Sequence, residues 1–186
     1  IQQGDRYSVS VTVDDNVEQY LDVQQAGDEV RIYLKPRLML SLRQVTLKAQ
    51  ITMPELTGLD LSGATRTSVT GFSGTKPLEV QVSGASRLTG NIEASDTRMD
   101  VSGASTVQLD GTATGIDVEA SGASTLRLEN FTTTDANVKA SGASRITVNA
   151  AGSVSGEASG ASTIEYLGKP SSVRVDTSGA SNVRSR

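Results

Sequence analysis

Carboxylates recur at one position beside a repeated tetrapeptide, and they are the first candidates for chemistry. The motif Ser-Gly-Ala-Ser, written Ser-Gly-Ala-Thr in its first copy, occurs seven times. Two places before its first serine, the chain carries in turn Asp60, Gln81, Asp100, Glu119, Lys139, Glu157 and Asp176, which we call the acidic column. In a strand this position points outward, away from apolar neighbours. Such carboxylates could bind Ca²⁺ or a cationic surface. We favour a solvated face that keeps the protein soluble and discourages lateral pairing of sheets.

Arginine recurs at a second position, four residues after the same serine. We call this set the arginine column, and its members are Arg66, Arg87, Thr106, Thr125, Arg145, Thr163 and Asn182. A guanidinium group could hold the carboxylate of a glycan through two parallel hydrogen bonds. Threonine and arginine are also ordinary residues on the outward face of a strand. We favour this second interpretation, and a binding face formed by the two columns is a hypothesis.

Catalysis would need acids in a groove. Asp96, Asp100 and Asp117 could supply them for the cleavage of an acidic polysaccharide. Enzymes of that kind have grooves walled by long loops, whereas the one insertion here, residues 70–77, is short. The chain has no tryptophan, four tyrosines and two phenylalanines, so it offers few rings for stacking on sugars. We therefore predict no catalytic residues and keep a polysaccharide-cleaving enzyme as the alternative.

Composition excludes several other classes of function. Cysteine and histidine are absent, which rules out disulfides, thiolate and imidazole chemistry and the usual ligands of zinc and copper. We expect no cofactor and no metal site, and any metal would be a hard cation held by oxygens. The net charge of −4 and the lack of a basic run argue against nucleic acid as a partner. No apolar stretch is long enough to cross a membrane as a helix.

The spacing of the motif points to a repeat architecture. Successive first serines are 21, 19, 19, 20, 18 and 19 residues apart. A unit this short cannot bury an apolar face alone and must stack on its neighbours. Apolar and polar residues alternate before and after the motif, as in Val80-x-Val82 and Val107-x-Leu109, which is the period of a strand. Each repeat should therefore contain two or three short strands, with a third side at small residues such as 91–94 or 111–114.

Coils of this length predict an all-β, right-handed, single-stranded parallel β-helix, a β-solenoid with about 19 residues per coil. Two rival solenoids fit less well. A left-handed helix of hexapeptides needs a strict coil of about 18 residues, and leucine-rich repeats need a leucine lattice with an asparagine ladder. The glycine of the motif should mark a corner, where the backbone turns and no Cβ fits. These corner residues are Gly63, Gly84, Gly103, Gly122, Gly142, Gly160 and Gly179.

Residues 1–58 lack the motif. We expect strands at residues 7–13, 30–35 and 45–53, a short helix at 17–21 after residues 14–16, and a tight turn at 26–28. Residues 1–186 are predicted to form a single β-solenoid domain. In it, residues 1–58 form irregular first coils that cover an open end, and residues 59–186 form the regular coils.

The stretch "ITMPELTGLDLSGAT", leading into serial "VSGAS" units and preceded by "QQGDRYSVSVTVDDNVEQYLDVQQAGDEVRIYLKP", resembles a bacterial family called putative auto-transporter adhesin, head GIN domain. The resemblance implies a right-handed parallel β-helix, export to the cell envelope or surface and an adhesive role. The resemblance assigns no catalytic residues to this chain. Family members usually begin with a further strand, so we expect that sequence upstream of Ile1, including a leader, has been removed.

Together these observations predict a non-enzymatic, exported binding module of the bacterial cell envelope, periplasm or cell surface. Its flat polar faces would bind a surface glycan or another surface protein through many weak contacts. The alternatives are a polysaccharide lyase or glycosidase and a purely structural spacer. No feature of the sequence indicates an oligomeric state.

Overall fold

The computed structural model describes residues 1–35 and 46–186. They form two compact units. The solenoid unit consists of Ile1–Asp5 and Met53–Arg186, and the antiparallel unit consists of Arg6–Thr52. The grouping of residues 1–186 into one domain stays a prediction.

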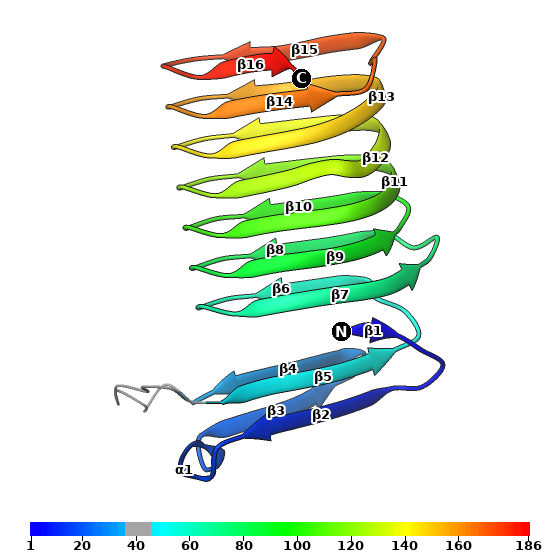
Figure 1. The fold of residues 1–186 in the computed structure, drawn as a ribbon, viewed down its shortest axis with the longest axis vertical. Helices are drawn as coiled ribbons and strands as arrows, with labels where there is room; N and C mark the ends of the chain where they lie inside the picture. The colour runs from blue at the N-terminus through cyan, green and yellow to red at the C-terminus, as the bar shows by residue number, and fades with distance from the viewer. Residues whose placement is uncertain (36–45) are drawn as a thin grey trace. The chain divides into compact units, whose positions relative to one another are not determined.

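The solenoid unit is a stack of parallel coils (Figure 1). It has about seven turns, and equivalent residues of neighbouring turns are about 19 residues apart. Every strand pairing within the stack is parallel, with Cα partners such as Met99 with Val80 on one side and Val118 on the other. The predicted all-β parallel β-solenoid is therefore confirmed.

Each coil has two long sides. The entry side is the sheet whose strands lead into the motif, and the exit side is the sheet whose strands leave it. The entry side contains β6 (Gly58–Leu61), β8 (Leu78–Val82), β10 (Thr97–Val101), the second halves of β11 (Thr106–Ala120), β12 (Thr125–Ala140) and β13 (Arg145–Ala158), and β15 (Ser172–Thr177). The exit side contains β1 (Gln2–Gln3), β7 (Arg66–Ser73), β9 (Arg87–Glu93), the first halves of β11, β12 and β13, then β14 (Thr163–Leu167) and β16 (Asn182–Ser185).

The expected third side is not a separate element in the middle coils. β11 runs unbroken through residues 111–114, so one curved strand joins the exit side to the entry side. The register between β11 and β12 shifts between Gln108 and Gly111, and a similar shift separates Arg127 from Thr132 in the pairing of β12 with β13. These bulges lie at the bend opposite the motif and absorb the differences in coil length.

A thin aliphatic core fills the space between the two sides. Val80, Met99, Val118 and Val138 point inward from the entry side and are fully buried. They face a matching set from the exit side, Leu88, Val107, Leu126 and Ile146, which is also fully buried. Because inward positions alternate with outward ones, the residues between them are left for the two flat outer faces.

The motif forms the tight turn at one end of every coil. Its glycines have φ between +68° and +76°. The turns stack directly, because the alanine amide of one copy donates to the glycine carbonyl of the copy before, as from Ala104 to Gly84 at 2.8 Å. The last serine of each inner copy is buried. In Ser162 its hydroxyl donates to the carbonyl of Ser159 at 2.8 Å, which satisfies a buried polar group.

The antiparallel unit contains two strand pairs. β2 (Ser8–Val13) pairs with β5 (Leu47–Met53), and β3 (Leu21–Ala26) pairs with β4 (Glu29–Leu34) through a turn at Gly27, where φ is +61°. The predicted strands at 7–13 and 30–35 correspond to β2 and β4, and the strand at 45–53 corresponds to β5, although Val45 lies outside the described residues. These pairings are antiparallel, whereas the coils of the solenoid unit are parallel. Covering of an open end by residues 1–58 stays a prediction.

Two local expectations for this unit differ from the structure. The helix α1 (Asp15–Glu18) is a single turn and ends before Leu21, where β3 begins. The strand β3 was not expected, because its sequence LDVQQA shows apolar alternation only at its start.

Candidate functional site

The acidic column is a straight file on the entry side. Each member is the Cα partner of the next across every coil boundary, from Asp60 with Gln81 to Glu157 with Asp176. Lys139 interrupts the carboxylates between Glu119 and Glu157. Exact stacking of equivalent positions is therefore a property of the fold, and any role of Asp60, Asp100, Glu119, Glu157 and Asp176 in binding stays a prediction.

The arginine column is a second straight file, on the exit side. Arg66 is the partner of Arg87, and the pairing continues through Thr106, Thr125 and Arg145 to the last coil. Because the two sheets enclose the core between them, the two columns lie on opposite faces of the solenoid unit. The structure does not bring the predicted acids and arginines together.

A groove of about 550 Å³ lies on the entry side, at the end of its strands that is remote from the motif. It is lined by Thr57, Pro77, Leu78, Glu79, Asp96, Thr97, Arg98, Gly115, Ile116, Asp117, Asp135, Ala136, Asn137, Ser153 and Ser155. Of the acids considered for catalysis, Asp96 and Asp117 line the groove and Asp100 does not. Gly115 lies beside Asp96 and has no side chain to fill the space between neighbouring coils.

Several polar side chains in the groove are hydrogen-bonded to one another. Both oxygens of the Asp117 carboxylate are engaged, since Arg98 Nη1 lies 3.3 Å from Oδ2 and Asn137 Nδ2 donates to Oδ1 at 3.1 Å. Arg98 Nε is also 3.6 Å from Asp100 Oδ2. Ser153 Oγ donates to Asp135 Oδ1 at 2.5 Å. The groove therefore presents an ordered set of donors and acceptors, which suits a ligand rich in hydroxyl groups.

Several groove residues were missed by the sequence reasoning, although a signal for them exists. Four places before the first serine of successive motif copies stand Glu79, Arg98, Asp117, Asn137 and Ser155. They form a polar file two positions from the acidic column, visible in the same alignment of repeats. No sequence signal showed that this file borders a hollow.

The carboxylates of the acidic column are the candidate ligands for a hard cation. Across residues 1–35 and 46–186, no three carboxylates gather closely enough to hold a metal ion. Members of the column come from different coils, and neighbouring strands are spaced by about 4.8 Å.

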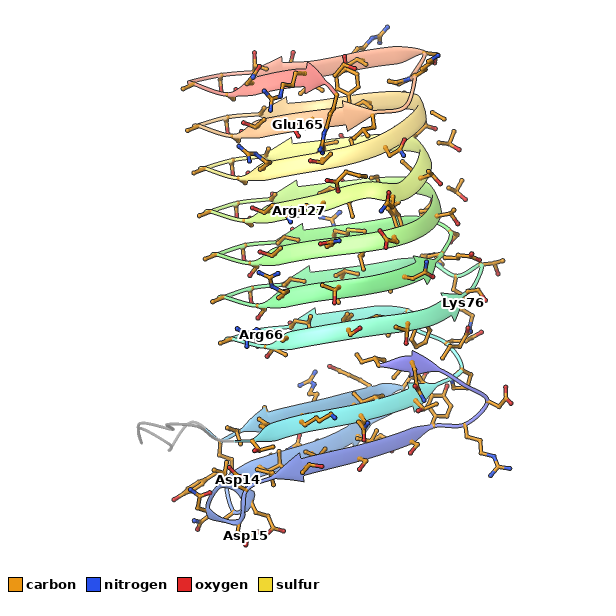
Figure 2. All side chains as sticks on the ribbon, in the orientation of Figure 1. Asp14, Asp15, Arg66, Lys76, Arg127 and Glu165 are labelled. Carbon is orange, nitrogen blue, oxygen red and sulfur yellow. The ribbon has the colours of Figure 1, made fainter. Side chains whose placement is uncertain are left out.

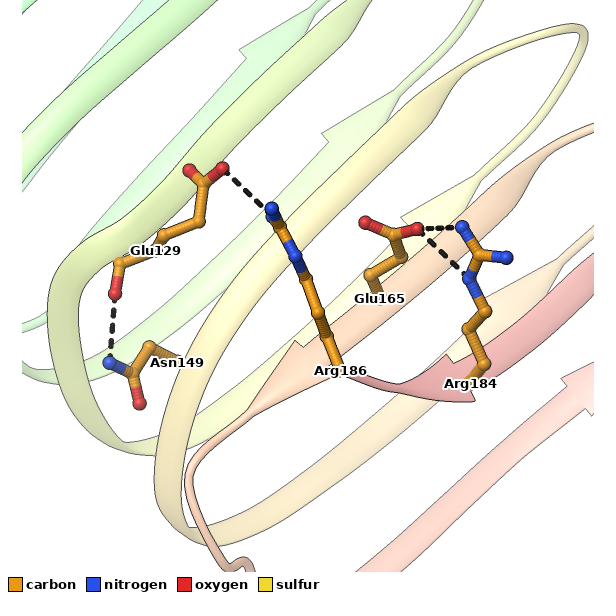
Figure 3. Close-up of polar contacts among 5 residues, drawn as sticks. All are labelled: Glu129, Asn149, Glu165, Arg184 and Arg186. Carbon is orange, nitrogen blue, oxygen red and sulfur yellow. Dashed lines mark hydrogen bonds and ion pairs between the residues drawn. The ribbon is translucent and has the colours of Figure 1, made fainter.

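Two ion pairs secure the last coils on the exit side (Figure 3). The Arg184 guanidinium donates to Glu165 Oε1, and Arg186 Nη1 lies 3.2 Å from Glu129 Oε1. Asn149 Nδ2 donates to the backbone carbonyl of Glu129 at 2.8 Å. Glu165 is only 8% exposed. Hydrogen bonding from Arg184 holds the pKa of the Glu165 carboxyl below its ordinary value of 4.5.

Replacing Glu165 by glutamine should lower the free energy of unfolding by about 1 kcal/mol at neutral pH, because the charge-assisted hydrogen bonds to Arg184 are lost. A carboxyl with a lowered pKa in the folded state stabilises above its unfolded pKa, and this stabilisation fades as the pH falls. The difference from the wild type should therefore be full above pH 4.5 and shrink below it. Urea unfolding at several pH values measures this.

Glu29→Gln, which removes an exposed pair with Arg31, is the control and should change stability little. A constant difference across the pH range would contradict the assignment.

Comparison with known proteins identifies the family. Residues 1–170 match the model of the family described as putative auto-transporter adhesin, head GIN domain. The chain belongs to this family. The resemblance indicated by the stretch ITMPELTGLDLSGAT and the serial motif is thereby confirmed. No curated protein matches this head GIN domain chain.

Solved structures share the fold of this family member. A putative adhesin from Bacteroides fragilis superposes with a TM-score of 0.85 at 17% identity, over 100% of this chain and 86% of that one. A putative adhesin from Parabacteroides merdae gives 0.71 at 15% identity, over 100% and 86%. A structure from Parabacteroides distasonis described as a putative lipid binding protein gives 0.69 at 19% identity, over 98% and 86%. At these identities the likeness establishes the fold alone.

The family description is consistent with an envelope or surface protein. Within the part of the head GIN domain chain that the structure describes, no helix has the length and apolar character needed to span a bilayer.

Proposed function

We propose that this chain is a non-enzymatic, exported binding module of the bacterial envelope or cell surface. It engages a repetitive ligand, a glycan or another surface protein, through the flat polar faces of the solenoid unit. The observation that carries the proposal is the exact stacking of outward positions, from Asp60 to Asp176 on one face and from Arg66 to Asn182 on the other. A ligand with repeating groups can contact several coils at once, so weak contacts add up to avidity. The adhesin description of the family supports this use.

The groove is a concave part of this binding surface. Carboxylate, amide and hydroxyl groups from Asp117, Asn137 and Ser155 line it beside the apolar Leu78 and Ile116. A sugar ring presents the same mixture of hydroxyl groups and apolar CH surface. Most of the lining surface is apolar and carries a few hydrogen-bonding groups, which suits the CH faces and hydroxyl groups of a sugar ring.

The observation that favours the second candidate, a polysaccharide-cleaving enzyme, is that one groove is lined by Asp96, Asp117 and Asp135. Two features weigh against it. Asp117 and Asp135 are already hydrogen-bonded by Arg98, Asn137 and Ser153. The coils are joined by tight turns, which supply no long loops to wall a cleft.

The test is a screen of the purified chain against immobilised polysaccharides and surface proteins, with both retention and release of reducing sugar ends measured. We expect retention on at least one ligand without release of oligosaccharides. Release that disappears in Asp117→Asn but persists in Asp60→Asn, a control outside the groove, would overturn the non-enzymatic proposal in favour of catalysis. If the chain is retained on none of the ligands, the remaining interpretation is a purely structural spacer.

A further inference from the structure

Four arginines on the exit side have no acidic partner among the described residues. Arg66, Arg87, Arg127 and Arg145 are exposed, and the described contacts give their side chains no hydrogen bond or ion pair. Arg184 and Arg186 on the same side are by contrast engaged with Glu165 and Glu129. The field of Arg145 reaches Glu165 without forming an ion pair. An unpaired guanidinium group on a flat face is available to an anionic ligand.

The four arginines follow the axis of the stack. Arg66 and Arg87 are Cα partners in neighbouring coils, and Arg145 occupies the same file three coils beyond Arg87. At about 4.8 Å per coil, the distance from Arg66 to Arg145 is about 19 Å. Arg127 lies two positions further along its own strand, in the coil between Thr106 and Arg145. Figure 2 shows Arg66 and Arg127 on different coils of this face.

Hydroxyl groups fill the places between the arginines. Thr106 and Thr125 occupy the two coils between Arg87 and Arg145 in the same file, and both are partly exposed. Thr89 and Gln108 stand in the neighbouring file, which also contains Arg127. The file thus contains, in order along a straight line, two arginines, two threonines and a third arginine.

We infer that this arginine face binds a linear anionic polysaccharide, carboxylated or sulfated, lying along the stack and across the strands. The inference rests on the proposed function and names its ligand class. Carboxylates or sulfates spaced along the polymer pair with successive guanidinium groups, and sugar hydroxyls meet Thr106 and Thr125. Carboxylates of the acidic column make the opposite face repulsive to the same ligand, which directs the polymer to the exit side.

Nucleic acid, another polyanion, fits this face less well. Single strands are held by aromatic side chains on which bases stack. Phe72 and Phe131 are buried within the solenoid unit, and Tyr166 packs against its core. The exit side therefore offers guanidinium and hydroxyl groups without a stacking platform among its described residues.

The experiment compares binding of polygalacturonate and heparin with binding of fully methyl-esterified polygalacturonate, which keeps the sugar chain but lacks the charge. The test variant is Arg66→Gln/Arg87→Gln/Arg145→Gln. The matched control, Lys139→Gln/Lys169→Gln/Arg174→Gln, also removes three positive charges, from positions outside both the strands of the exit side and the groove. We expect the test variant to bind at least one anionic polymer about tenfold more weakly, since three exposed contacts each contribute a factor of about two to three. The control should bind as the wild type does, and both variants should keep the wild-type circular dichroism.

Other results would overturn the inference. Equal binding of the esterified polymer, equal losses in the two variants, or equally tight binding of single-stranded DNA would each show that the arginine face does not select an anionic glycan. If the test variant changes its oligomeric state but binds the glycan as the wild type does, this face is an interface between copies of the chain. If the chain binds only a neutral glycan or only a protein, the inference is refuted and the proposed function stands. If the chain binds no ligand at all, both the inference and the proposed function are refuted.

Discussion

Replacement of Gly103 by alanine should destabilise the solenoid unit by about 3 kcal/mol or more. Two costs combine. The backbone at Gly103 has φ of +75°, a conformation that costs a residue with a Cβ about 1–2 kcal/mol. A Cβ there would also lie 2.4 Å from the carbonyl oxygen of Gly84, which belongs to the backbone of the preceding coil. The two turns would have to separate, which weakens the hydrogen bond from Ala104 to Gly84. Urea or thermal unfolding monitored by circular dichroism measures the loss.

Gly63→Ala is the matched control for this prediction. Gly63 has nearly the same φ, +76°, but nothing lies within 4 Å of the place its Cβ would take. Its replacement should cost only the conformational term, about 1–2 kcal/mol. A larger loss at Gly103 than at Gly63 isolates the effect of coil stacking. Equal losses would mean that the turn conformation alone explains the repeated glycine, and the stacking account of the motif would be wrong.

This pair of variants also shows why so much of the fold could be predicted. The motif recurs because its glycine and alanine must fit against the same residues of the coil beneath, so the sequence itself carries the register. Once successive motifs are aligned, every outward position falls into a file, and the acidic and arginine columns follow by counting from Ser102 or any other copy. The structure pairs these residues as the counting predicts.

The bend and the groove could not be obtained in the same way. Small residues at 111–114 suit a turn as well as a curved strand, and strand preference depends strongly on context. The structure uses a curved strand, with bulges where β12 adds a residue relative to β11. The groove depends on the absence of a side chain at Gly115 and on the side-chain contacts of Asp117 and Asp135, which involve neighbouring coils. Spacing along the sequence does not report such hollows.

Glu165 illustrates a further limit of pattern reasoning. Alternation places it outward on the exit side, and an outward glutamate is expected to be exposed. It is instead buried, with the Arg184 guanidinium hydrogen-bonded to its carboxylate. Arg186, which reaches Glu129 on β12, contributes to the field at the same carboxylate. Contacts made by side chains that span several coils override the exposure that the position alone predicts.

Removal of one whole coil should leave a folded protein. Deletion of residues 102–120 joins Val101 to the intact motif that begins at Ser121, so β10 leads into the turn that β11 formerly reached. The stacking of inward-facing side chains is preserved. Val101 and Ala140 both pair with Ala120 in the intact stack, so they can pair with each other in the shortened chain. In a repeat protein each unit contacts only its neighbours, so stability should fall by the contribution of one unit, about 1–3 kcal/mol for 19 residues. Circular dichroism and urea unfolding of the shortened chain measure this.

Removal of half a coil should instead abolish the fold. Deletion of residues 111–120 joins an exit strand directly to the motif at Ser121, which requires an entry strand before it. No partner then remains between β10 and the second half of β12, and the buried Ile116 and Val118 are lost from the core between them. Since the shorter deletion removes fewer residues but does more damage, stability depends on completing coils rather than on chain length. A half-coil variant as stable as the whole-coil variant would show that the coils are not independent stacking units, and the account of the repeat given above would have to be abandoned.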